Sequence, residues 1–76
     1  MDEQFYVDLA EQLEVDAVVP DDILTDFEAW DSLTVLGIVA MIDARYRVNV
    51  FARELAAIST VGELAQLVSA KLGARS

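Results

Sequence analysis

The chain has 76 residues, of which 55% are hydrophobic, and its 14 Asp and Glu against five Lys and Arg give a formal net charge of −9. This length allows one domain over residues 1–76, and the apolar share is too high for a disordered chain. The absence of cysteine and histidine excludes disulfides, the usual structural zinc sites, and Ser-His-Asp or Cys-His catalysis.

The first predicted element is a helix from about Glu3 to Leu13, with Asp2 as its cap. Phe5, Leu9 and Leu13 recur every four residues and therefore lie on one face of this helix. We expect that face to be buried against the rest of the protein.

Residues 14–30 form a long connection, which Pro20 interrupts with a turn. A loop of this length inside a compact domain is usually functional. Its acidic residues lack the alternate spacing and central glycine of an EF-hand, so we expect a solvated acidic surface that binds cations loosely, and no dedicated metal site. Five apolar residues are predicted to anchor the loop to the core: Val18, Val19, Ile23, Leu24 and Phe27.

The second predicted helix spans about Ser32 to Arg47 and is apolar on two faces. The face expected to contact the core carries Val35, Ile38, Val39, Ile42 and Tyr46. The opposite face is made partly of small residues, namely Leu33, Leu36, Gly37, Ala40 and Ala44. Since a helix in a thin bundle buries one face well, the second face either packs on another element or is an exposed docking surface.

The last third of the chain combines a loop, a short helix and a final helix. Residues 48–51 alternate like a strand, but one short strand has no partner here, so we expect a loop. Residues 53–57 should form a short helix. Thr60 and Glu63 match a capping box that starts the last helix, which Gly73 should end. The buried stripe of that helix is predicted to be Val61, Leu64, Ala65, Val68 and Leu72.

These elements predict an all-α fold. It is a small four-helix bundle, with three main helices, one short helix and a long loop between the first two.

The most informative stretch is the junction between the long loop and the second helix, Trp30-Asp31-Ser32-Leu33. Ser32 would stand at a helix N-terminus, where unpaired N–H groups and the helix dipole favour a phosphate group. Asp31 could hold a metal ion or orient a hydroxyl. An ordinary helix cap has the same residue types. Taken with the chain's length, acidity and order of helices, however, the motif resembles the attachment site of acyl carrier proteins.

This resemblance covers the chain from about Phe5 to Leu72 and implies one covalent site. A phosphopantetheinyl transferase would move 4′-phosphopantetheine from coenzyme A onto Ser32, assisted by Asp31. The chain would then be a carrier and not an enzyme, holding acyl groups as thioesters in fatty-acid-like, polyketide-like or other specialised biosynthesis.

The resemblance also implies partners and an acyl pocket. The partners would include an acyl-loading ligase or acyltransferase and ketosynthase-type enzymes. They would dock on Leu33, Leu36, Gly37, Ala40 and Ala44. The acyl chain would be sheltered by Ile38, Ile42, Val50, Leu55 and Ile58.

Two departures from carriers of primary fatty-acid synthesis indicate a specialised carrier. Those carriers typically have glutamates along the second helix, whereas the corresponding positions here are Gly37, Asp43, Ala44 and Arg45. Trp30 stands where a glycine is frequent. Two alternatives stay open, an aminoacyl or peptidyl carrier with the same chemistry and an unmodified acidic adaptor that binds a basic protein surface.

Charge is distributed unevenly along the chain. Residues 1–44 hold twelve Asp and Glu and no Lys or Arg, whereas residues 45–76 hold five basic residues and two acidic ones. This pattern favours basic protein surfaces as partners and disfavours nucleic acid. No apolar run reaches the length of a membrane span, and the acidic start argues against a signal peptide. We therefore expect a cytoplasmic monomer.

Overall fold

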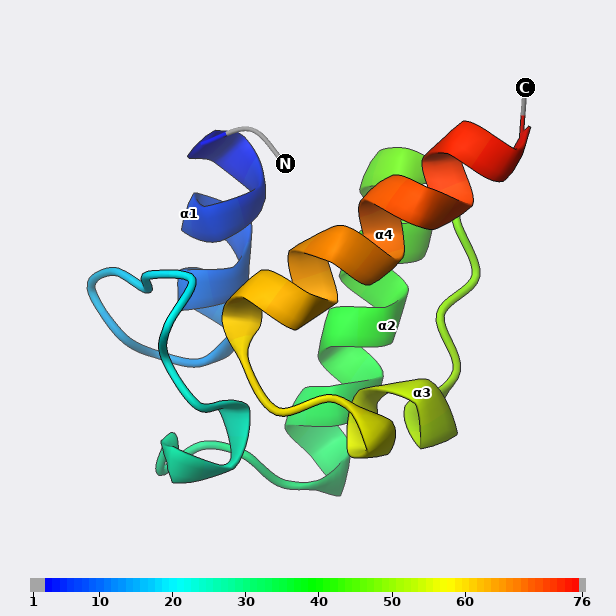
Figure 1. Ribbon diagram of the computed structural model, residues 1–76. Helices are drawn as coiled ribbons and strands as arrows, with labels where there is room; N and C mark the ends of the chain where they lie inside the picture. The colour runs from blue at the N-terminus through cyan, green and yellow to red at the C-terminus, as the bar shows by residue number, and fades with distance from the viewer. Residues whose placement is uncertain (1–2, 76) are drawn as a thin grey trace.

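The computed structural model describes residues 3–75, and within this range it is all-α and has no strand, as predicted. Its α-helices are α1 (Glu3–Gln12), α2 (Ser32–Tyr46), α3 (Ala52–Ala57) and α4 (Val61–Arg75), with a short 3₁₀ helix, η1, at Leu24–Asp26. Figure 1 shows α2 running through the middle of the molecule, with α4 crossing in front of it, α1 to its left and α3 beside its N-terminal end. This arrangement is the predicted small helical bundle.

The core lies where the helices face one another. Phe5, Leu9 and Leu13 are buried, which confirms the predicted face of α1. Ile38 and Ile42 supply the buried face of α2. The stripe of α4 is also confirmed: Val61, Leu64, Ala65 and Val68 are buried and Leu72 is half-buried. Burial of these side chains is the main favourable contribution to folding in a chain of this size.

The start and end of α1 follow from local backbone chemistry. The predicted cap, Asp2, lies outside the described residues. The helix ends at Gln12, one residue before the predicted end, and Glu14 then takes the left-handed conformation with φ 61°. The amide of Val15 donates to the carbonyl of Ala10 at 3.0 Å, which is typical of a helix closed by a left-handed residue.

The long loop is held to the start of α4 by backbone hydrogen bonds. Gly62 N donates to Pro20 O at 2.9 Å, and Val61 N donates to Asp22 O at 3.0 Å. Leu24 N donates to Ser59 O at 2.9 Å. These bonds fix the path of the chain towards Ser32 although the loop has no strand or long helix of its own.

Two of the five predicted loop anchors are wrong. Val18 and Leu24 are buried and Phe27 packs against the core, but the side chains of Val19 and Ile23 are 55% and 43% exposed. Backbone contacts hold these two positions instead. Val19 N donates to the Asp22 carboxylate at 2.9 Å, and Ile23 forms an isolated bridge with Thr60.

The connection from α2 to α3 is extended but pairs with no strand among residues 3–75, so the predicted loop is confirmed. Val48 and Val50 point into the core and Asn49 is exposed, which explains the strand-like alternation. At the start of α3, Glu54 accepts the Phe51 amide hydrogen at 3.0 Å. This bond, together with the nearby Lys71 ammonium, holds the pKa of Glu54 below its ordinary value.

The predicted capping box of α4 is present. Thr60 N donates to Glu63 Oε1 at 3.1 Å, and Glu63 N donates to Thr60 Oγ1 at 3.1 Å. The prediction that Gly73 ends the helix is wrong, because α4 continues to Arg75. Gly73 lacks positive φ, and nothing lies within 4 Å of the position where a Cβ would stand. It is an exposed helical residue.

An ion pair between a buried carboxylate and an exposed arginine joins α1 to the end of α2. Asp8 is only 4% exposed, and its Oδ1 accepts from Gln4 Nε2 at 3.0 Å and lies 3.5 Å from Arg45 Nη2. Its Oδ2 has no hydrogen-bond partner among the described residues. Arg45 is therefore the cation that makes burial of this carboxylate tolerable.

Candidate functional site

Ser32 is the first residue of α2, and Asp31 is its N-cap. Asp31 has an extended backbone, with φ −148° and ψ 179°, and its Oδ1 accepts from Thr34 N at 2.8 Å. Its carbonyl accepts from Val35 N at 2.9 Å. The cap thus fixes where the helix starts and leaves the Ser32 side chain exposed to solvent.

Two backbone amides at this helix end remain open. Those of Ser32 and Leu33 have no acceptor within residues 3–75, whereas Thr34 and Val35 both donate to Asp31. Open amides and the positive end of the helix dipole favour an anion on this side of the helix. A phosphate ester on the Ser32 hydroxyl would place its charge in that field. The arrangement therefore fits a phosphate-linked group.

A surface cavity of about 370 Å³ opens directly beside Ser32. Ser32 itself lines it, so a group attached to the hydroxyl starts at the cavity wall. The remaining lining is mostly apolar and comes from three segments: Trp30 and Asp31 from the loop, Val35 and Leu36 from α2, and Ala52 from α3. Trp30 is half-buried and packs against the core, and it also forms part of this cavity.

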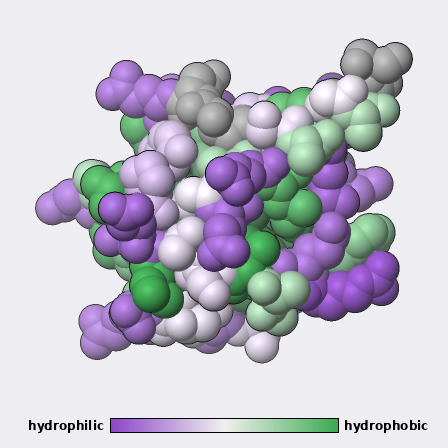
Figure 2. Space-filling view, viewed as in Figure 1, coloured by the Kyte–Doolittle hydropathy of each residue, from purple (hydrophilic) through white to green (hydrophobic). Residues whose placement is uncertain are grey.

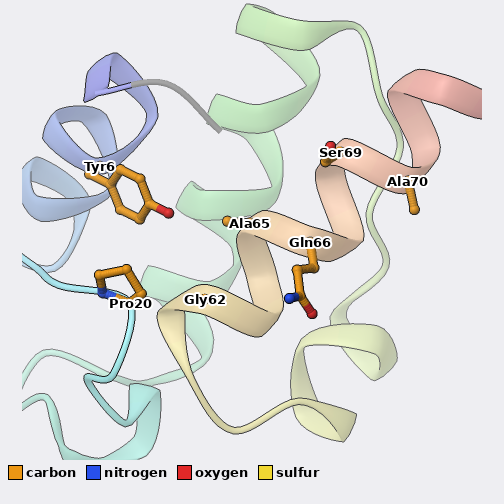
Figure 3. A pocket seen from close by; sticks show the side chains of 7 residues that line it. All are labelled: Tyr6, Pro20, Gly62, Ala65, Gln66, Ser69 and Ala70. Atoms are coloured by element: carbon orange, nitrogen blue, oxygen red, sulfur yellow. The ribbon is translucent and has the colours of Figure 1, made fainter.

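A larger cavity of about 500 Å³ lies between α1, the Pro20 turn and α4 (Figure 3). The Tyr6 hydroxyl points from α1 towards α4, and Gln66 and Ser69 supply the other polar side chains. It shares no lining residue with the cavity beside Ser32. No residue that the sequence marked for chemistry lines it.

The outer face of α2 is exposed at four of its five predicted positions. Leu33 and Leu36 are 78% and 59% exposed, and Ala40 and Ala44 are exposed as well. The prediction is wrong for Gly37, which is half-buried. A Cβ at this position would lie 2.7 Å from Gln12 Oε1. This glycine faces α1 and takes part in packing between the two helices. The exposed apolar face therefore consists of Leu33, Leu36, Ala40 and Ala44.

The residues predicted to shelter an acyl chain belong to the packed core. Ile38, Ile42, Val50 and Leu55 are at most 1% exposed, and Ile58 is half-buried against them. None of the five lines the cavity beside Ser32. An acyl chain would have to separate these side chains in order to enter between them, so their role as a pocket stays a prediction.

The sequence did not indicate a cluster of cations around Phe51, near the start of α3. The guanidinium of Arg53 lies 5.0 Å from the centre of the Phe51 ring, and the Lys71 ammonium lies 5.9 Å from it. Lys71 also pairs with Glu54 at 3.1 Å. In Figure 2, hydrophilic residues gather at the lower right, over α3. Because these residues come from two distant segments, periodicity alone could not show the cluster.

Two further observations limit the kinds of site that the described residues can form. Within residues 3–75, no group of three or more Asp, Glu, His or Cys is placed to hold a metal ion. No helix in that range is both long enough and apolar enough to cross a membrane.

Fold and site together define a class, that of small helical bundles that present one exposed serine at the start of their second long helix. A family model described as phosphopantetheine attachment site matches residues 5–68. The chain therefore belongs to the phosphopantetheine attachment-site family, whose members carry covalently attached 4′-phosphopantetheine. Such domains are carriers modified by a transferase and are not themselves catalytic. Comparisons with curated proteins and with solved structures gave no significant match.

Proposed function

We propose that the protein carries acyl groups as thioesters on a 4′-phosphopantetheine arm attached to Ser32. The observation that carries this proposal is the exposed Ser32 hydroxyl at the N-terminus of α2, inside the span of the family match. When attached, the arm supplies a thiol on which an acyl group is held as a thioester. The family membership favours this function over that of an unmodified adaptor.

Attachment needs a catalyst that the chain does not contain. An O–P bond forms between Ser32 Oγ and the phosphorus next to the pantetheine of coenzyme A, and the P–O bond to the leaving phosphate breaks. The hydroxyl proton must leave, but the chain has no histidine to accept it. Because such carriers are modified by a transferase, we assign the base to that enzyme and the orientation of the hydroxyl to Asp31. Asp31 Oδ1 accepts from Thr34 N at 2.8 Å, so Oδ2 would be the oxygen left to hold the transferase's metal ion or to orient the serine hydroxyl.

Partner enzymes are proposed to dock on the exposed apolar face of α2. Leu33 and Leu36 lie within the first turns after Ser32, so a protein that binds them also reaches the arm. Aliphatic contacts would govern recognition here, and the acidic loop would speed encounter with basic surfaces. The partners proposed are an acyl-loading ligase or acyltransferase and ketosynthase-type or other acyl-processing enzymes.

Mass spectrometry tests the attachment site. The apo protein is incubated with coenzyme A, magnesium and a broad-specificity phosphopantetheinyl transferase, and its intact mass is measured. Wild type should gain one phosphopantetheine and Ser32→Ala none, whereas Ser59→Ala and Ser69→Ala should behave as wild type. Modification that persists in Ser32→Ala would refute the site. An unmodified wild-type chain, under conditions that load a control carrier, would refute the function.

The nature of the cargo is tested with the holo protein. Acyl-loading ligases and amino-acid-adenylating enzymes are offered with their substrates, and the mass of the loaded arm is measured. Loading with aminoacyl groups alone would replace the acyl proposal by the aminoacyl or peptidyl one.

A further inference from the structure

The cavity beside Ser32 has walls that suit a particular ligand. Trp30, Val35, Leu36 and Ala52 give it apolar surface, and an indole ring carries one N–H donor in addition to its apolar body. A phosphopantetheine arm has matching groups near its phosphate, which are a carbon with two methyl groups, a hydroxyl and two amides. Methyl groups suit the apolar walls, and an amide carbonyl can accept from the indole.

Tethering decides which molecule occupies this cavity. Since Ser32 lines it, a group attached to the hydroxyl is present there at an effective concentration of the order of millimolar or more. Weak contacts are enough for frequent occupancy at such a concentration. The alternative shelter, between Ile38, Ile42 and their neighbours, is closed by tight packing.

We propose that Trp30 is a positioning residue, which holds the part of the arm nearest to Ser32 in this cavity. The proposal rests on the proposed function, because the arm must be attached for Trp30 to contact it. In the unloaded holo protein, the near end of the arm then lies against the loop and the start of α3. The arm therefore leaves the surface of the protein in a defined direction when a partner enzyme binds.

The composition of the chain permits a clean test. Trp30 is the only tryptophan, so fluorescence excited at a wavelength that tryptophan absorbs and the two tyrosines do not reports on this residue. Apo and holo proteins are compared by acrylamide quenching, with intact mass measured on the same samples. The quenching constant should fall by about twofold on conversion to the holo form, as expected for a site occupied most of the time. Transferase-treated Ser32→Ala should show the apo value.

A matched pair of variants on α3 isolates the cavity. Ala52→Leu fills it, so the holo form of this variant should keep the quenching constant of its own apo form. Ala56→Leu adds the same side chain at an exposed position of the same helix that does not line the cavity, and it should behave as wild type. Both substitutions suit a helix, so neither should unfold the protein.

A second measurement follows the near end of the arm directly. The two methyl groups next to the phosphate should have different NMR chemical shifts in holo Trp30→Ala and in holo wild type, because the indole ring no longer lies against them. A mass gain with unchanged Trp30 quenching would overturn the inference while the proposed function stands. No mass gain on wild type would overturn the proposed function itself. If Trp30→Ala fails to fold, the comparison of Ala52→Leu with Ala56→Leu still tests the inference.

Discussion

Asp31 combines two roles that substitution can separate. It caps α2 through the hydrogen bond from Thr34 N at 2.8 Å, and its carboxylate is proposed to assist the transferase at Ser32. Asparagine keeps an acceptor oxygen in the same place and is as good a cap as aspartate, but it has no charge. Alanine removes both the cap and the charge. Comparing Asp31→Asn with Asp31→Ala therefore separates the effect of Asp31 on the stability of the fold from its effect on modification of Ser32.

The size of each effect follows from the geometry. Loss of an N-cap costs about 1 kcal/mol, and loss of a negative charge at an exposed helix N-terminus costs only about 0.3 kcal/mol. In a domain of this length, 1 kcal/mol lowers Tm by roughly 4–8 °C. Asp31→Ala should therefore lower Tm by about 4–8 °C, and Asp31→Asn by roughly 1–3 °C.

Thermal melting by circular dichroism and the rate of phosphopantetheinylation measure the two roles in parallel. Asp31→Asn should fold nearly as well as wild type but be modified at least about tenfold more slowly, the equivalent of 1.4 kcal/mol. If Asp31→Asn melts as low as Asp31→Ala, the capping argument fails. If it is modified at the wild-type rate, the carboxylate has no part in attachment.

Two further predictions concern α2. Ile42 is fully buried, so Ile42→Glu should unfold the domain. Ala40 is exposed, so Ala40→Glu should keep the wild-type Tm but slow acyl transfer to the native partner by about tenfold or more. If Ala40→Glu melts the domain and Ile42→Glu does not, the two faces of α2 are assigned wrongly. Gly37→Ala should raise the free energy of unfolding by up to about 1 kcal/mol, because a helix favours alanine and the only close atoms belong to the flexible end of Gln12. A lower Tm for Gly37→Ala would show that Gln12 cannot move aside.

Features that depend on neighbours in the sequence were predictable. Asp31 at the start of α2 and the Thr60–Glu63 box at the start of α4 are both capping patterns, whose hydrogen bonds span three residues. Helical periodicity likewise identified Ile38 and Ile42 as core residues. Because these patterns involve residues close together in the sequence, they can be recognised without knowledge of the tertiary structure.

Features that depend on distant segments were not predictable. Asp8 reads as one more surface acid until α2 brings Arg45 to within 3.5 Å of it. Ile23 resembles an anchor because it is apolar, but its backbone bridges Thr60 and its side chain faces solvent. The cavity beside Ser32 also depends on tertiary structure, because Ala52 reaches it from the far side of the α2–α3 connection.

The position of charges along α2 has a consequence for motion in solution. Asp31 and Ser32 stand at one end of this 15-residue helix and Arg45 and Arg47 at the other, a separation of roughly 22 Å at 1.5 Å per residue. Acidic residues of the loop, such as Glu28, precede the serine end. Asp8, which pairs with Arg45, and Asp43 offset the cations at the far end, so the net negative charge lies at the serine end. A positively charged surface therefore exerts a torque on the molecule. The torque orients Ser32 towards the positively charged surface before the two proteins touch, so a larger share of encounters is productive. Added salt screens the field and removes this effect.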